Sequence, residues 1–405
     1  MRHETVPSLR ALVALVGLAL LGWTASAAAQ DSTPAPRQPR GWRVSASFRL
    51  GAEYDDNVFL LDAGRKDAVA SPTAAEVASG RYADMDDAAD LVTTLGAALE
   101  LKRPGLSGRT LTITPAAAYE LYARNSARSN VVLGLSFEQD LPRSSRIRLL
   151  GRVSPEHFTK NYLADAVDGD LNGSISDAER RYDAGEYREA EASLDYRFRV
   201  AKSTRDHRFG ASLQLGAGYY DRAYAEPFGG RDLAGPTAEA RALLTLSRRV
   251  SADVTYGFAS LSGDPADQVV LLDEADFGED FNGNGNSIDP DVRVVTLVDR
   301  SRTEHSLGGE VRFEVSRRVD LDVGYEHRWR SYSSDEPLDV THLDRRDSRD
   351  RFGAELGMRL SPRMKLRLGG EAASQDTNRP GDPGAADDTS DYTRFRAGLG
   401  LTYAL

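Results

Sequence analysis

The 405-residue sequence contains no cysteine, so disulfide bonds cannot hold the fold together. After the first thirty residues it has no run of about twenty apolar residues, the length that a membrane-spanning helix requires. Positive charge is not in excess either, because the formal net charge is −11. This balance argues against nucleic acid as a partner. Something other than disulfide bonds must therefore hold the fold together, and no helical membrane span is expected after the first thirty residues.

The first thirty residues predict a secretory signal peptide. Arg2 and Arg10 give a positive start, residues 11–21 are apolar, and small residues at 25–29 suit cleavage. Residues 31–40 contain three prolines and are expected to form a flexible periplasmic linker. Residues 41–405 are then the folded domain of an exported protein.

Apolar side chains at every second position recur through this domain. Alternate residues of a strand share one face, and in a transmembrane barrel only that face meets lipid. The last stripe, at 395–405, ends in Tyr403 and Leu405, an aromatic and a hydrophobe that typically close an outer-membrane barrel. Earlier stripes lie at 42–54, 95–101, 111–121, 131–137, 147–153, 190–198, 209–219, 238–246, 254–258, 307–315, 321–329, 352–360 and 366–368. The pattern predicts an all-β, transmembrane, antiparallel up-and-down barrel of about fourteen strands, an even number as bacterial barrels require.

The connections alternate between short and long, which supports the same fold. Short connections at 103–108, 141–145, 247–249, 316–318 and 361–363 would be periplasmic turns. Long connections at 55–88, 160–187, 222–236, 262–301, 331–348 and 374–391 would be extracellular loops, which places both termini in the periplasm. Residues 269–272 and 292–298 also resemble strands. We expect them to extend the ninth and tenth strands beyond the membrane as a hairpin, and a barrel with two more strands is the alternative.

Charged side chains occupy the opposite face of these strands. A charge facing lipid at the midplane costs on the order of 2–4 kcal/mol, so this face should line a lumen, which frequent glycines leave open. The mixed charges predict either a salt-bridge lattice around a water-filled barrel or arginine rows that steer an anionic solute. The candidate selectivity residues are Arg43, Arg49, Arg148, Arg152, Arg197, Arg312, Arg328, Arg359, Arg394, Arg396, Glu310 and Glu355.

Two loop segments match the twelve-residue calcium loop of EF-hands, one at 168–179 and a weaker one at 280–291. Carboxylate and amide oxygens at their alternating positions are the ligands that Ca²⁺ prefers. A polar loop of Asp-Gly and Asn-Gly turns is the alternative interpretation. The predicted ligands are Asp168, Asp170, Asn172, Ser174 and Glu179 in the first loop and Asp280, Asn282, Asn284, Asn286 and Asp291 in the second. Calcium is the only cofactor that the sequence suggests.

No catalytic residues are predicted, and the chain is not expected to be an enzyme. His305, His327 and Trp329 fall on the lipid side at the outer ends of strands, where an interfacial aromatic girdle belongs. A serine–histidine–acid arrangement would need one of the histidines beside a serine, and no spacing indicates it.

The end of the first strand carries the segment Tyr54-Asp-Asp-Asn-Val58. This segment resembles the opening of a group of outer-membrane β-barrel porins, some of which are associated with exopolysaccharide export. Asp55, Asp56 and Asn57 would end the strand and turn the chain into the outer loop. The resemblance implies a channel in the outer membrane of a Gram-negative bacterium.

Two functions follow from these patterns. The first is a porin-like channel for small hydrophilic or carbohydrate-related solutes. The second is a closed structural or adhesive barrel whose calcium-ordered loops bind an extracellular partner. Expected partners are outer-membrane lipid and lipopolysaccharide, the barrel-assembly machinery during insertion, and a small hydrophilic solute. Whether residues 262–301 fold inward as a plug or outward as a hairpin would separate the two functions.

Overall fold

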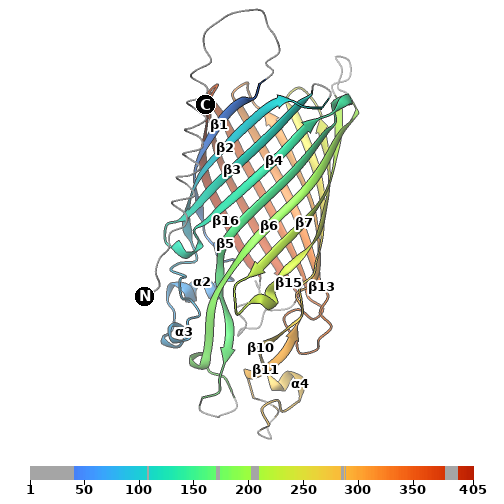
Figure 1. The fold of residues 1–405 in the computed structure, drawn as a ribbon. Coiled ribbons are helices and arrows are strands. Elements are labelled where there is room, and N and C mark those ends of the chain that lie inside the picture. The colour runs from blue at the N-terminus through green and yellow to red at the C-terminus, as the bar shows by residue number, and fades with distance from the viewer. Residues whose placement is uncertain are drawn as a thin grey trace, which may run out of the picture.

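The computed structural model describes residues 41–106, 109–169, 174–201, 209–283, 287, 289–378 and 391–405. Fourteen antiparallel strands form a closed barrel, in which each strand pairs with its neighbours in sequence and β9 pairs with β12 (Figure 1). The strands are β1 (Arg43–Asp55), β2 (Asp90–Pro104), β3 (Thr110–Tyr122), β4 (Asn130–Asp140), β5 (Arg146–Ala166), β6 (Arg180–Ala201), β7 (Gly210–Tyr224), β8 (Leu233–Thr245), β9 (Val250–Leu261), β12 (Arg302–Glu314), β13 (Val319–Tyr332), β14 (Arg346–Ser361), β15 (Met364–Thr377) and β16 (Tyr392–Ala404). The predicted fold class and strand count are confirmed.

The alternation of the sequence becomes two different faces of the wall. Apolar side chains on the outer face stay exposed within the protein, as at Leu50, Leu194 and Leu399, each more than half exposed. A belt of this kind is stable against hydrocarbon and unfavourable against water. β1 pairs with β16 along Ser47–Asp55, so the first and last strands close the barrel and leave no free edge.

Helices are few and short. They are α2 (Ala63–Ala70), α3 (Ala74–Ser79) and α4 (Glu274–Phe277), with 3₁₀ turns at Ser126–Arg128, Pro142–Ser144, Asp177–Glu179 and Gly229–Arg231. Thr73 and Glu76 form a capping box that fixes the start of α3. None of the helices in the described part of the chain combines the length and apolar character needed to cross a membrane.

The longer connections gather at the end of the barrel opposite the C-terminus (Figure 1). Buried apolar side chains within these connections form small cores. Val58, Phe59 and Leu61, in the loop after β1, pack with Val69 of α2 and Phe158 of β5. Further cores join the tips of β5 and β6 to β10, and β10 to residues 338 and 340 of the loop after β13. The outer end is therefore a folded layer.

Residues 262–301 form a hairpin that stands beyond the strand ends (Figure 1). It consists of β10 (Ala266–Leu272) and β11 (Val292–Val298), which pair only with each other as a separate two-stranded sheet. The prediction that the ninth and tenth barrel strands continue into this hairpin is wrong, since β9 ends at Leu261 and β12 begins at Arg302. Pro265, which has no N–H to donate, separates β9 from β10. The alternative of two additional barrel strands is also wrong.

Proline removes a ladder hydrogen bond within a strand, so the sequence predicts a bulge or an earlier strand end at both Pro115 and Pro155. The prediction is confirmed at Pro155 and wrong at Pro115. At Pro155 a bulge is observed, because the β5–β6 register shifts between Ser154 and His157. At Pro115 the register of β2 and β3 is the same on both sides, and two ladder pairs are simply missing. The predicted loop 160–187 is also shorter, because β5 runs on to Ala166 and β6 starts at Arg180.

Candidate functional site

The barrel encloses a cavity of about 820 Å³ whose wall is strongly polar. Two smaller cavities, of about 570 and 370 Å³, share wall residues with it, so the three are contiguous. Every residue that lines them belongs to a barrel strand, and nine of those around the main cavity are glycines. Its ionisable side chains are Glu53, Asp55, Glu120, Glu239, Asp253, Glu310, Asp322, Glu326, Glu355 and Glu371, with Arg49, Arg241, Arg328, Arg351, Arg367, Arg394 and Arg396. Carboxylates thus outnumber arginines around the main cavity.

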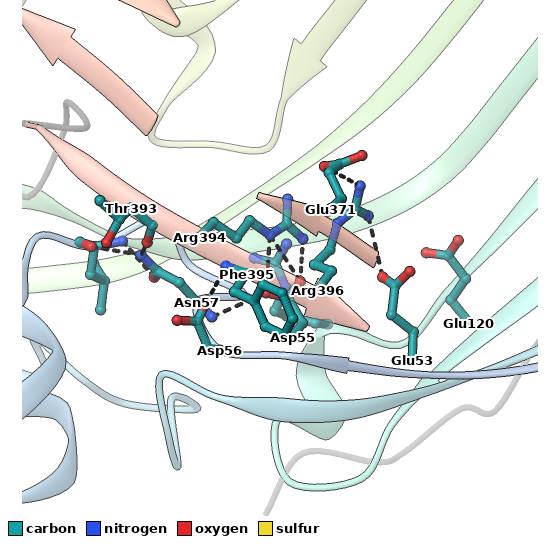
Figure 2. Close-up of polar contacts among 12 residues, drawn as sticks. Glu53, Asp55, Asp56, Asn57, Glu120, Glu371, Thr393, Arg394, Phe395 and Arg396 are labelled. Carbon is teal, nitrogen blue, oxygen red and sulfur yellow. Dashed lines mark hydrogen bonds and ion pairs between the residues drawn. The ribbon is translucent and has the colours of Figure 1, made fainter. Parts of the chain in front are cut away.

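Ion pairs link neighbouring strands across this wall. Arg396 on β16 lies 3.2 Å from Glu53 on β1 and 2.5 Å from Glu371 on β15 (Figure 2). Arg351 on β14 continues the chain, 3.7 Å from Glu371 and 3.2 Å from Glu326 on β13. Five strands are joined in this way, from β1 through β16 to β13. Such a network keeps charges in place without an apolar core, because each buried charge has a partner.

The predicted selectivity residues fall into two groups. Those with an ion-pair partner are Arg148, Arg312, Arg328, Arg394, Arg396, Glu310 and Glu355. Arg43, Arg49, Arg152, Arg197 and Arg359 form no ion pair with any described residue; of these, Arg49 lines the main cavity and Arg197 the second. The geometry therefore favours the salt-bridge lattice over continuous rows of arginine.

Sequence reasoning missed several wall residues. Glu239 and Arg241 on β8 and Asp253 on β9 line the main cavity, and Arg241 binds Asp253 at 2.8 Å. All three occupy inward positions of stripes that were recognised, so the period-2 pattern contained the signal. Their importance comes from the pairing of β9 with both β8 and β12, which a single sequence does not reveal.

The Tyr54–Val58 segment lies where the barrel closes. β1 ends at Asp55, as predicted, and the Nε of Arg394 on β16 lies 3.0 Å from both oxygens of that carboxylate (Figure 2). The backbone N–H groups of Asp56 and Phe395 donate, respectively, to the Phe395 carbonyl at 3.1 Å and to the Asp56 carboxylate at 2.6 Å. The segment thus ties the first strand to the last.

Asn57 extends this tie into the outer loop. Its side-chain amide donates to the carbonyls of Leu61 at 2.7 Å and Thr393 at 2.9 Å, and its Oδ1 accepts from the Leu61 N–H at 2.8 Å. Asp55 and Asn57 are almost fully buried. We call Asp55, Asp56, Asn57, Thr393, Arg394 and Phe395 the seam clasp. Its two segments, one at the end of β1 and one at the start of β16, lie more than 330 residues apart in sequence, so sequence analysis found only the turn after β1.

The two predicted calcium loops lie side by side. The N–H of Ile175 donates to the Asp291 carbonyl at 3.1 Å, and Arg180 pairs with the Asp291 carboxylate at 3.0 Å. Glu179 accepts hydrogen bonds from the N–H groups of Gly169 and Ser176 at 2.6 and 2.9 Å. Four predicted ligands, Asp170, Asn172, Asn284 and Asn286, lie outside the described residues. Within the described residues, no three acidic, histidine or cysteine side chains converge on a metal position, and calcium binding remains a prediction.

The remaining predicted ligands serve the loops themselves. The Asp280 carboxylate accepts from the Gly283 N–H at 2.6 Å, and the Asn282 amide donates to Asp289 at 3.0 Å. The hydroxyl of Ser174 donates to the Pro290 carbonyl at 2.8 Å. Asp168 immediately precedes Gly169, whose backbone N–H donates to the Glu179 carboxylate. These contacts join the described parts of the two loops to each other.

The predicted aromatic girdle is present. The His305 ring stacks on Trp329 with centroids 5.3 Å apart, and His305 Nδ1 lies 2.8 Å from the Tyr256 hydroxyl. His327 lies 2.9 Å from the Asp350 carboxylate on the same outer surface. None of these histidines contacts a serine in a way that would activate it, and the cluster fits an interface between hydrocarbon and head groups.

A buried polar group orders the loop at 333–345, between β13 and β14. Asp339 accepts hydrogen bonds from the Ser334 and Thr341 hydroxyls at 2.8 and 2.9 Å, and His342 Nδ1 lies 2.8 Å away. Burial opposes the charge on Asp339, but these hydrogen bonds and His342 outweigh it and hold the pKa of Asp339 below its usual value. The Ser334 hydroxyl contacts the Asp339 carboxylate and not His342, so the geometry is that of a structural hydrogen-bond cluster.

The buried cluster around Asp339 predicts that the stability of this loop depends on pH. A carboxylate with a lowered pKa stabilises the fold above the pKa of the unfolded chain, and this stabilisation is lost as the pH falls through the folded pKa. We expect trypsin cleavage after Arg345 and Arg346 to accelerate on acidification through that range. Asp339→Asn should show roughly tenfold faster cleavage already at neutral pH, because hydrogen bonds to a charged group contribute about 1.5–3 kcal/mol each. Asp335→Asn, an exposed change in the same loop, should have no effect; equal cleavage of both variants would contradict this account.

Comparison with known proteins finds only distant similarity to solved structures. No protein-family model matches it, and no curated protein does. The outer-membrane channel DcaP of Acinetobacter baumannii is 9% identical, with a TM-score of 0.40 over 92% of this chain and 100% of that one. OmpT of Vibrio cholerae, as a loop L8 deletion mutant, is 11% identical, with a TM-score of 0.38 over 90% and 100%. A bacterial polysaccharide outer-membrane secretin is 8% identical, with a TM-score of 0.40 over 89% and 98%. All three are outer-membrane proteins.

Proposed function

We propose that this protein is a channel in the bacterial outer membrane that passes small hydrophilic solutes, carbohydrate-related ones among them. The observation that carries the proposal is the set of contiguous cavities inside the barrel, whose walls are strand residues only. Nine glycines keep side chains out of the main cavity, and its ionised groups suit water and hydroxyl groups. The proposed role is transport and not catalysis.

The arrangement of the outer loops supports the same role. The hairpin of β10 and β11 stands beyond the barrel and contacts the tips of β5 and β6. Among the described residues of this hairpin, none lines any of the three cavities. An inward-folded plug would have placed hairpin side chains on the lumen wall. The apolar outer belt and the predicted signal peptide support the outer membrane as the location.

A liposome-swelling experiment tests the proposal. Purified protein is reconstituted into liposomes, which are then diluted into iso-osmotic solutions of arabinose, glucose, sucrose and raffinose. Swelling should be fast with the monosaccharides and slower as the sugar becomes larger, since the wall residues set a size limit. Liposomes with heat-denatured protein are the control. Folded protein that admits none of these sugars would contradict the proposal.

The adhesive barrel is a second candidate, because the outer layer has apolar cores of its own. It predicts that Ca²⁺ protects the paired loops at 168–179 and 280–291 from protease, with binding in the range of about 10⁻⁴–10⁻³ M that extracellular sites show. Glu179→Gln should abolish the protection, whereas Glu279→Gln, just before the second loop, should preserve it. Equal cleavage with Ca²⁺ and with chelator would remove the calcium prediction.

A further inference from the structure

One row of lumen-facing side chains at the outer mouth contains two arginines, a glutamine and a tyrosine, all of which can donate hydrogen bonds. The strand registers place Arg328 of β13 opposite Arg349 of β14, Arg349 opposite Gln375 of β15, and Gln375 opposite Tyr392 of β16. Each lies an even number of positions from a cavity-lining residue on its own strand, and Arg328 lines the main cavity itself. We call these four residues the donor row.

Arg328 and Arg349 are cross-strand neighbours, and among the described residues no carboxylate forms an ion pair with both of them. Like charges directly opposite on antiparallel strands are destabilising. The nearby carboxylates are already engaged: Asp347 lies 2.7 Å from the Nε of Arg345, and Glu326 lies 3.0 and 3.2 Å from Arg328 and Arg351. Arg349 has no ion pair or side-chain hydrogen bond to any described residue, and its Nε is buried without a partner.

Tyr392 provides a second, independent observation, a buried polar group in the same row that has no partner. Its side chain is only 3% exposed, and its hydroxyl has no hydrogen-bond partner in the described part of the chain. Tyr392 lies within electrostatic range of Arg349. Buried polar groups are nearly always paired, and leaving one unpaired is costly. The row therefore combines an unpaired guanidinium with an unpaired phenol.

We propose that the donor row binds an oxyanion, carboxylate or phosphate, carried by the hydrophilic solute at the outer mouth. An arginine fork matches the planar carboxylate and the phosphate geometrically, and charge-assisted hydrogen bonds of this kind are strong. The oxyanion would neutralise the Arg328–Arg349 repulsion and accept from the Tyr392 hydroxyl. This inference rests on the proposed channel function and names the class of solute: a sugar acid or sugar phosphate. Because Tyr392 is the first residue of β16, a solute meets this row before the carboxylate-rich main cavity.

Calorimetric titration of the detergent-solubilised protein tests the inference without any need for conduction. The probes are D-glucuronate and D-glucose 6-phosphate, with D-glucose as the neutral control. At least one charged probe should bind measurably more tightly than glucose. Arg349→Gln should weaken that binding by about tenfold or more, the effect expected for one lost charge-assisted interaction. Tyr392→Phe, which removes only the hydroxyl, should weaken it by a smaller factor.

Arg363→Gln is the matched control, because Arg363 lies in the turn between β14 and β15, at the opposite end of the barrel from the donor row, and forms no ion pair with any described residue. It should leave the binding of both probes unchanged. Equal affinity of the Arg349→Gln and unmodified proteins, or no difference between the charged probes and glucose, would overturn the inference. A protein that binds glucuronate through Arg349 yet passes no solute would support the site and contradict the channel, so the two failures are distinguishable.

Discussion

Arg394→Gln should destabilise the folded barrel by roughly 3–5 kcal/mol, the usual cost of removing one partner from a buried ion pair. The variant leaves the Asp55 carboxylate, 2% exposed at its side chain, without its counter-ion inside the seam clasp. β1 and β16 close the barrel, and no connecting loop joins them because they are its first and last strands. The lost ion pair therefore weakens a strand pair that only non-covalent contacts hold together. We expect a clearly lower temperature for the shift from the folded to the unfolded band in heat-modifiability electrophoresis.

Arg396→Gln provides the matched control for this prediction. Arg396 occupies the next inward position of β16, and its partners Glu53 and Glu371 are 42% and 19% exposed at their side chains. Pairs that are this accessible contribute about 0–1 kcal/mol. If both arginine variants melted at the same temperature, the seam clasp would have no special role. Asp55→Asn combined with Arg394→Gln should recover part of the stability, because no unpaired charge then remains.

Gly353→Trp should lower the single-channel conductance about twofold or more, because it places an indole in the main cavity of a pore whose lining sets its width. Gly353 lines the 820 Å³ cavity, and a Cβ there meets only the Gly370 carbonyl oxygen, at 3.7 Å. The backbone therefore accepts the side chain, and the indole projects into the lumen. Conductance is measured in planar bilayers at the same salt concentration as for the unmodified protein.

Gly151→Trp controls for the general effect of adding an indole to a strand. Gly151 lies on β5 between Leu149 and Val153, on the exposed outer face, lines none of the three lumen cavities described above, and has no atom within 4 Å of its Cβ position. This variant should conduct nearly as well as the unmodified protein. An unchanged conductance in Gly353→Trp, with the protein folded, would mean that solutes do not pass through the main cavity.

The architecture was predictable because its signals are local. Alternate residues of a strand face opposite sides because the strand is pleated. Each barrel strand exposes one side to lipid, so the same apolar alternation, as at 395–405, recurs in every strand. The end of β1 at Asp55 and the bulge at Pro155 were also predictable, since turn residues and proline act on their own neighbourhood.

The functional arrangement was not predictable to the same degree, because it depends on register between distant strands. Arg394 meets Asp55 only because the barrel closes, and Arg328 faces Arg349 only in the observed β13–β14 register. The sequence placed Arg328 and Arg394 on the lumen face but supplied no partners for them. The hairpin of β10 and β11 was recognised as two strands, yet its separation from β9 and β12 depends on packing against the tips of β5 and β6.

The most direct test of the central claim is a planar-bilayer recording of the purified, folded protein. An open lumen with walls of ionised residues and glycine predicts discrete current steps that scale linearly with voltage. Folding is checked on the same sample by heat-modifiability electrophoresis. Discrete, ohmic steps that Gly353→Trp reduces would support the channel. Correctly folded protein that inserts into the bilayer and carries no current would contradict it.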